Sequence, residues 1–248
     1  MISQVKKLLF RGEFLFSPKN KSSKIVYYHD LFDNTKHPAY TTMATNIGLF
    51  CQHLDKIKKS GFNVVSKITK QDEEIMIVFD DGWQGFYEFR DFFHANNIYP
   101  TVCMPASLVG LAGYLTKEQL QQLHNEGFGI ASHSWTHQSM TNYNNQEKSL
   151  LRELYDSKSF LEDIISAEID TFCYPQGMFS RTIYYKTLEF GYREIFSCID
   201  GNYFDEFLPN CRRRNLIQFS DIKELECVLF GANKLKANRH IRMHYSNF

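Results

Sequence analysis

The sequence has little net charge, few prolines and no long apolar run. Its 248 residues carry 28 basic and 28 acidic side chains, so no overall field attracts the chain to nucleic acid. We therefore expect no nucleic acid partner. No segment approaches the roughly 20 apolar residues that a membrane-spanning helix needs, so no transmembrane segment is expected. With six prolines and no low-complexity tract, the chain favours one globular domain.

The amino terminus lacks the pattern of a signal peptide. Residues 1–11 include basic side chains, but neither a sufficient apolar run nor a small-residue cleavage site follows. Six cysteines are scattered without C-x-x-C spacing, which is typical of free thiols in a reducing compartment. These features predict a cytoplasmic protein. Segment 5–16 mixes apolar and basic residues, so we expect it to pack against the domain, with peripheral contact to a membrane surface as the alternative.

Predicted strands and helices alternate along the chain. About seven short apolar segments alternate with amphipathic helical segments, the longest of them at 145–167, and no linker interrupts the pattern. The alternation predicts a single parallel α/β domain, and both a barrel and a doubly wound sheet fit it. In either fold, functional side chains gather at the carboxyl ends of the strands.

The most informative stretch is an apolar run that ends in two carboxylates. Residues 75–79 are typical of a strand buried on both faces, and Asp80, Asp81 and Gly82 follow directly. Adjacent carboxylates at such a place repel each other and lose hydration, and a bound metal ion would relieve both effects. An ordinary strand-end turn is the alternative, because Asp and Gly are common turn residues.

Two histidines follow another predicted strand, at 128–132. His133 and His137 are four residues apart, and a carboxylate from a separate strand would complete a set of one oxygen and two nitrogen ligands. Such a set leaves positions on a divalent ion open to water and substrate, which is typical of a catalytic site. Taken alone, the histidines also fit a pair bonded to the backbone.

Three motifs, in order, resemble those of the polysaccharide deacetylases, carbohydrate esterase family four. They are Val-Phe-Asp-Asp-Gly at 78–82, His-Ser-Trp-Thr-His at 133–137 and Phe-Cys-Tyr-Pro-Gln-Gly at 172–177. The resemblance covers about residues 24–231. It implies a distorted, partly open (β/α) barrel with about seven strands.

The resemblance also implies a role for each matching residue. Asp81, His133 and His137 would hold a divalent metal ion, and Asp80 would be the general base that takes a proton from water. A main-chain N–H in the turn formed by Tyr174 to Gln176 would stabilise the oxyanion. Gln176 stands where family members often have tyrosine, which leaves a main-chain role intact but alters the pocket wall.

The general acid and the arginine that orients the base match the family less directly. His29, after the predicted strand 25–28, resembles the Tyr-His strand end of the exopolysaccharide deacetylase branch. We choose it as the acid, with His244 as its rival. For the arginine, the candidates are Arg213 and Arg214, and we choose Arg213.

Two tryptophans lie beside the motifs. Trp83 fits both a sugar-stacking role and a place in the core. Trp135 lies inside the histidine motif, and we assign it to substrate binding together with Tyr174 and Gln176.

The sequence therefore predicts a metal-dependent hydrolase that removes the N-acetyl group of an amino sugar. Zinc suits the ligands, and cobalt, nickel or iron would also fit. The expected substrate is a glycan, or a lipid- or nucleotide-linked precursor in surface polysaccharide synthesis. A glycan-binding member without activity and a carbohydrate O-acetyl esterase are the alternatives. We expect a lead-in at 1–23, a deacetylase-like catalytic domain at 24–240 and a tail at 241–248.

Overall fold

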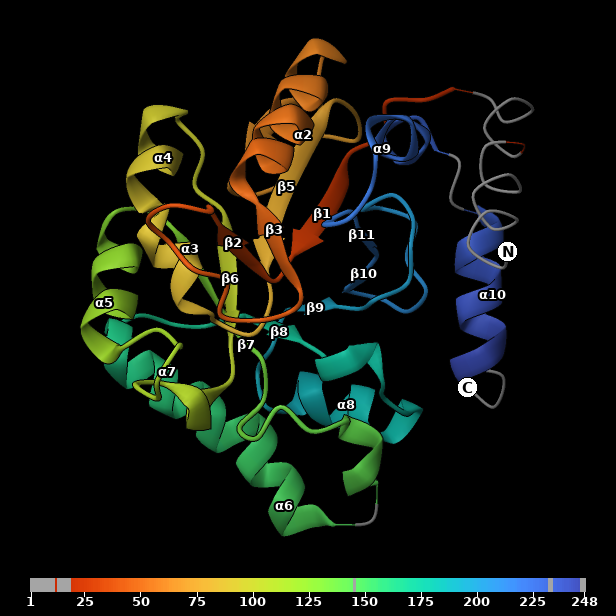
Figure 1. Cartoon of the computed structure of the whole chain (residues 1–248). Helices are drawn as coiled ribbons and strands as arrows, with labels where there is room; N and C mark the ends of the chain where they lie inside the picture. The colour runs from red at the N-terminus through yellow and green to blue at the C-terminus, as the bar shows by residue number, and fades with distance from the viewer. Residues whose placement is uncertain (1–11, 13–18, 145, 232–233, 246–248) are drawn as a thin grey trace.

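The computed structural model describes Gly12 and residues 19–144, 146–231 and 234–245 (Figure 1). Apart from Gly12, segment 5–16 lies outside the described residues. Its expected packing, with membrane contact as the alternative, therefore stays a prediction. Within the described part of the chain, no helix is both long and apolar enough to cross a membrane.

A parallel β-sheet forms the centre of the molecule and curves into a nearly closed barrel (Figure 1). Its strands are β1 (Lys24–Tyr28), β4 (Asn63–Val65), β5 (Glu74–Phe79), β6 (Thr101–Met104), β7 (Gly129–Ser132), β8 (Thr171–Cys173), β9 (Glu194–Phe196), β10 (Cys211–Arg212) and β11 (Arg214–Leu216). In the described residues the barrel runs β10-β9-β8-β7-β6-β5-β1-β11, and β4 pairs with β5 beside this path. The predicted (β/α) barrel is confirmed, with eight strands on the path where about seven were expected.

Helices surround the barrel (Figure 1). They are α2 (Ile47–Lys59), α3 (Gln84–Glu88), α4 (Arg90–Ala95), α5 (Lys117–Asn125), α6 (Glu147–Leu151), α7 (Ser157–Ile165), α8 (Arg181–Glu189), α9 (Ile222–Leu229) and α10 (Lys234–His244), with short 3₁₀ turns η1 (Ala106–Leu108), η2 (Met140–Tyr143) and η4 (Pro175–Gly177). A small parallel pair, β2 (Asp30–Phe32) and β3 (Ala44–Asn46), precedes α2. A capping box formed by Thr116 and Gln119 begins α5.

The alternation of side chains along the strands divides the core into two layers. One layer lies inside the barrel and includes Ile25, Tyr27, Met76, Val78, Cys103, Ala131, Cys173 and Phe196. The other packs against the helices and includes Val26, Tyr28, Ile75, Ile77, Phe79, Val102, Met104 and Phe172. Because neighbouring residues of a strand point to opposite faces, the next inward position after β5 is Asp80 and the next after β1 is His29.

The helix predicted over 145–167 contains a change of helical type. Between α6 and α7 the chain forms one stretch of π-helix, η3 (Arg152–Asp156). Ser157 Oγ lies 2.6 Å from the carbonyl oxygen of Glu153 and 3.1 Å from that of Leu154, and the hydroxyl donates to both. Such π turns are rare and are frequent at functional sites.

The boundary predicted between the domain and a tail at residue 241 falls inside α10. This helix runs from Lys234 to His244, and Tyr245 after it is buried. Residues on both sides of the predicted boundary therefore lie in one helix, and the division into a domain and a tail stays a prediction. The polar sequence of α10 has no strong helical pattern of apolar residues, which is why the helix was not predicted.

Candidate active site

A cavity of about 370 Å³ lies at the carboxyl ends of the barrel strands. This volume is at the lower end of the range for small-molecule sites, about 300–1,000 Å³. The side chains around it include His29, Asp80, Asp81, His133, His137, Gln176, Cys198, Asp200, Lys236 and His240. Strand ends supply most of them, and α10 supplies Lys236 and His240.

Asp81, His133 and His137 converge on one point of the cavity wall. Asp81 Oδ1 lies 2.9 Å from Nε2 of His137 and 3.4 Å from Nε2 of His133. One ligand atom from each residue lies within 4.8 Å of the other two. A carboxylate oxygen and two imidazole nitrogens suit zinc and related divalent ions, so the chemistry of this donor set fits such an ion.

An unusual backbone brings these three side chains together. Asp81 has a φ of 73° and is followed by Gly82 with a φ of 70°. A Cβ at Gly82 would lie 2.0 Å from Sδ of Met104, so only glycine fits this turn. Ser134 and His137 also have positive φ values, 66° and 60°. Left-handed backbone at non-glycine residues is costly and is often found at functional sites.

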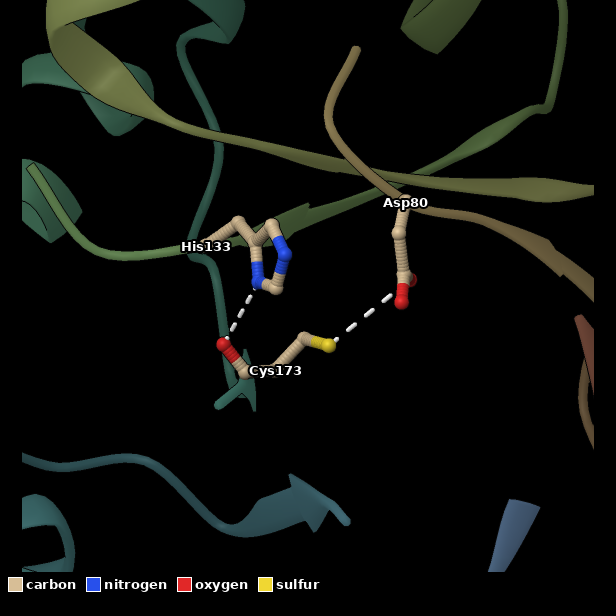
Figure 2. A group of neighbouring side chains, drawn as sticks. All are labelled: Asp80, His133 and Cys173. Carbon is tan, nitrogen blue, oxygen red and sulfur yellow. Dashed lines mark hydrogen bonds between the residues drawn. The ribbon is translucent and has the colours of Figure 1, made fainter. Parts of the chain in front are cut away.

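The ring of His133 is oriented by its second nitrogen. Nδ1 of His133 donates to the carbonyl oxygen of Cys173 at 2.7 Å, as Figure 2 shows. This bond places the hydrogen on Nδ1 and leaves Nε2 directed toward Asp81. His133 is therefore set up to offer Nε2 as a ligand.

Glu153 holds the loop that carries the histidines. Its Oε2 accepts the backbone N–H groups of Trp135 at 3.0 Å and Thr136 at 2.9 Å, and its Oε1 accepts the Thr136 hydroxyl at 2.9 Å. Glu153 is only 2% exposed and belongs to the π-helix η3. The π-helix η3 thus places the buried carboxylate of Glu153 beside the histidine motif.

Asp80 is paired with Arg214. The guanidinium donates from Nη1 to Oδ1 at 2.7 Å and from Nη2 to Oδ2 at 2.9 Å, and both side chains are buried. The expectation that Arg213 orients the base is wrong, because the arginine that bonds Asp80 is its neighbour Arg214. Arg213 donates instead to the backbone carbonyls of Asp200 and Asp205. Arg214 is the first residue of β11 and points into the barrel toward Asp80, whereas Arg213 lies just before this strand.

The local charges change the pKa of both aspartates in the same direction. Burial acts to raise the pKa of Asp81, but hydrogen bonds from His133 and His137 outweigh it and hold this pKa far below its ordinary value. Burial likewise opposes ionisation of Asp80, and the charges of Arg214 and then His133 lower its pKa overall. Both carboxyl groups are therefore ionised at neutral pH.

Asp80, His133 and Cys173 form a second group whose ligand atoms lie close together (Figure 2). This group is a poor metal site. Asp80 is already neutralised by Arg214, and Nδ1 of His133 is committed to a carbonyl oxygen. Burial raises the pKa of the Cys173 thiol well above its ordinary value, so the thiol keeps its proton and donates to Asp80 Oδ1 at 3.7 Å.

The turn after β8 has one main-chain N–H for which the described residues offer no acceptor. The N–H of Tyr174 donates to the carbonyl oxygen of Phe196, and Pro175 has no N–H. Gln176 has a φ of 58° and lines the cavity, and among the described residues no acceptor takes its N–H. Of the predicted turn, Gln176 is the residue that can stabilise an oxyanion.

The side chain of Tyr174 lies in the core and not in the cavity. Its ring stacks on Phe179 with centroids 4.2 Å apart, and its hydroxyl is 2.8 Å from Oγ1 of Thr187. The expectation that Tyr174 contacts substrate is corrected to a structural role for its side chain.

His29 lines the cavity, as expected for an acid at this end of β1. Its Nδ1 is 2.6 Å from Oε1 of Gln218, which requires Nδ1 to be the donor and leaves Nε2 available. The Gln218 amide donates in turn to Sδ of Met43 at 3.6 Å. His244 is exposed and is not among the cavity residues, whereas His240 on the same helix is.

Neither tryptophan lines the cavity. Trp135 packs edge-on against Phe160, and the guanidinium of Arg152 lies over its ring. Its predicted contact with substrate is therefore not supported by its position. Trp83 stacks on Tyr114 with centroids 4.3 Å apart.

Several residues around the site were not predicted. Asp200 and Gly201 form an Asp-Gly pair in the loop after β9, but three residues separate them from the end of that strand, so the strand-end signal was weak. Lys236, which forms an ion pair with Asp200 at 2.6 Å, carried no such signal. Glu153 gave none either, because it resembles any acidic residue on an amphipathic helix.

A parallel barrel with convergent carboxylates and imidazoles at the carboxyl ends of its strands fits the (β/α) barrel enzymes. Residues 67–195 match the family model described as polysaccharide deacetylase. The match covers just over half of the chain, and the chain belongs to this family. The matched region contains the three motifs, at 78–82, 133–137 and 172–177. It contains neither His29 nor Arg214.

A known protein resembles part of the chain in sequence. YxkH of Bacillus subtilis (strain 168), which its name proposes to be a polysaccharide deacetylase, is 26% identical over 109 residues, or 43% of this chain and 38% of YxkH. The match thus spans well under two thirds of that relative.

Three solved structures share the fold. BC0361, a polysaccharide deacetylase from Bacillus cereus, has a TM-score of 0.70 at 18% identity, over 85% of this chain and 69% of that chain. IcaB from Ammonifex degensii has a TM-score of 0.72 at 16% identity, over 85% of this chain and 98% of that chain. A de-N-acetylase from Aggregatibacter actinomycetemcomitans has a TM-score of 0.71 at 17% identity, over 83% of this chain and 99% of that chain. At these identities the likeness concerns the fold.

Proposed function

We propose that the protein is a metal-dependent hydrolase that removes the N-acetyl group of an amino sugar. The observation that carries this proposal is the position of two carboxylates with different partners on one cavity wall. Asp81 faces two imidazoles, and Asp80 faces a guanidinium. Membership of the polysaccharide deacetylase family supports the same reaction class.

In this proposal, Asp81, His133 and His137 hold the metal ion, and zinc suits them best, with cobalt, nickel or iron as other fits. A divalent ion supplies a Lewis acid that polarises a carbonyl and lowers the pKa of water from about 15.7 toward roughly 7. The oriented ring of His133 and the left-handed turn at Asp81 hold the ligands in place beforehand.

Asp80 is the general base. Its Oδ1 accepts from Arg214 and from the Cys173 thiol, its Oδ2 accepts from Arg214, and we assign to Oδ2 the lone pair that takes a proton from water. The guanidinium fixes the carboxylate plane and keeps it ionised at neutral pH. The N–H of Gln176 stabilises the negative charge that develops on the acetyl oxygen.

His29 is the general acid. Its Nδ1–H is held by Gln218, so His29 acts as an acid in its imidazolium form, in which Nε2 carries the proton that passes to the leaving nitrogen. An amine must be protonated as it leaves, which makes a positioned acid more valuable for an amide than for an ester. This requirement supports N-deacetylation over the O-acetyl esterase alternative.

For the substrate, we propose an acetylated amino sugar within a glycan, or linked to a lipid or nucleotide in surface polysaccharide synthesis. The size of the cavity supports entry of one sugar unit with the rest of the substrate outside. A cytoplasmic location stays a prediction.

The decisive experiment measures acetate release from a panel of N-acetylated and O-acetylated sugars. Metal-free protein, protein reloaded with Zn²⁺ and the Asp80→Asn variant are compared. We expect release from N-acetylated substrates only by the reloaded native protein, while Asp80→Asn binds metal normally and loses activity. Full activity of Asp80→Asn would exclude Asp80 as base. Metal and glycan binding without any acetate release would favour the glycan-binding alternative.

A further inference from the structure

Asp81 uses its two oxygens for different partners. Oδ1 faces the two histidines, and Oδ2 accepts the indole N–H of Trp83 at 3.2 Å. A carboxylate with no partner on its second oxygen can rotate and present either oxygen to the histidines. The bond from Trp83 removes this freedom.

Trp83 is itself held from its other side. Its ring stacks on Tyr114 at an interplanar angle of 25°, with 4.3 Å between the centroids. The two residues also form an isolated antiparallel bridge, and the next N–H, that of Gln84, donates to the carbonyl oxygen of Gly113 at 2.8 Å. The direction of the indole N–H is therefore set by the packing of the loop before α5.

The chemistry of indole suits this task. Its N–H is a donor only, so it supports an ionised carboxylate and cannot compete with Asp81 for a cation. The bond from Nδ1 of His133 to the carbonyl oxygen of Cys173 orients the imidazole ring in a comparable way. Each of these two side chains is thus oriented through the atom that faces away from the metal position.

We propose that Trp83 is a positioning residue that fixes Asp81 as a metal ligand, reserving Oδ1 for the ion. This inference rests on the proposed metal site and assigns Trp83 a role other than sugar stacking, consistent with its place outside the cavity. Partners of metal ligands typically contribute 10–100-fold to metal affinity, so an effect of about this size is expected.

The test is the Trp83→Phe variant, which keeps an aromatic ring on Tyr114 and loses the N–H. Dissociation constants for Zn²⁺ and Co²⁺ are measured on full-length, metal-free protein by competition with a chromophoric chelator. The expected result is a weakening of about 10–100-fold with an unchanged melting temperature of the metal-free protein. This readout does not depend on knowing the substrate.

The chain offers two matched controls. Trp135→Phe removes the other indole, which lies in the histidine motif but makes no bond to a metal ligand side chain, and Tyr114→Phe keeps the stack while removing a hydroxyl. Both should bind metal as the native protein does.

The outcomes separate this inference from the proposed function. The proposed metal site fails if the native protein binds neither ion. It also fails if the His137→Ala variant binds the ions as tightly as the native protein does. If the native protein binds and Trp83→Phe binds equally tightly, only the role of Trp83 is overturned. A loss of affinity that is matched by an equal loss of stability in the metal-free protein also overturns it, because the residue then acts through folding.

Discussion

Arg214 holds both oxygens of Asp80 in a buried, parallel pair of hydrogen bonds, at 2.7 and 2.9 Å. Its neighbour Arg213 bonds only backbone carbonyls near the surface. Two adjacent residues of the same type thus have different partners, which makes them a natural pair for mutagenesis.

Arg214→Lys should lower kcat by about 10–100-fold, because a lysine cannot reproduce the two-pronged contact that orients the base. Arg214→Met should also lower the free energy of unfolding by about 3–5 kcal/mol, since it leaves a buried carboxylate unpaired. Acetate release and urea denaturation measure the two effects. Arg213→Lys is the control, and an equal loss of activity in it would contradict the assignment.

His29→Ala should lower kcat by about 10²–10⁴-fold, because the leaving nitrogen then has no positioned acid. Acetate release by the variant and by the native protein under the same conditions measures this loss. His244→Ala should behave as the native protein because His244 is exposed. The acid has been misplaced if His29→Ala keeps its full rate while His240→Ala or His244→Ala loses about tenfold or more.

Cys173→Ala should keep native affinity for Zn²⁺, whereas His137→Ala should lose it. The physical reason is that the Cys173 thiol retains its proton and bonds Asp80, while His137 faces Asp81 directly. Equilibrium metal binding on the two variants distinguishes the two overlapping groups that share His133. The reverse order of affinities would place the ion on Asp80, His133 and Cys173.

Asp30 should make stability fall with rising pH. Burial raises the pKa of its carboxyl to about 7, against the opposing N–H of Tyr40. The contribution of Asp30 is complete below its unfolded pKa of 3.8, declines as pH rises above that value, and is lost once pH passes about 7.

The Asp30→Asn variant isolates this effect. Between about pH 5 and pH 8 the native protein should lose roughly 2–3 kcal/mol more unfolding free energy than Asp30→Asn. Urea denaturation at both values measures the difference. Parallel pH dependences for the two proteins would mean that Asp30 is ionised in the folded state throughout this range.

The parallel α/β domain and the convergence of Asp81, His133 and His137 could be predicted because both depend on local patterns, whereas the choice of a barrel rested on the family resemblance of the three motifs. Apolar strands followed by polar residues place Asp81, His133 and His137 at one end of a parallel sheet whatever the detailed packing. The choice between Arg213 and Arg214 depends on which face of β11 points inward, and a shift of one residue reverses it. No local pattern fixes that register.

The directions of side chains in loops could not be predicted from the sequence either. Trp135 lies within the histidine motif but turns toward α7, and the donors of its loop are satisfied by Glu153 from a π turn. Such turns have no clear sequence signal. The role of α10 was missed because Lys236 and His240 reach the cavity from a polar helix distant in the chain.

The pairing of β1 with β11 has a consequence for how the protein folds. Asp80 and Arg214 are 134 positions apart, and Arg214 reaches Asp80 only from β11, whose pairing with β1 joins segments from opposite ends of the domain. Contacts of such separation cost loop-closure entropy and are associated with slower folding. Until β11 docks, Asp80 is a carboxylate at a buried strand end without its counterion. Pairing of Asp80 with Arg214 and docking of β11 on β1 therefore depend on each other.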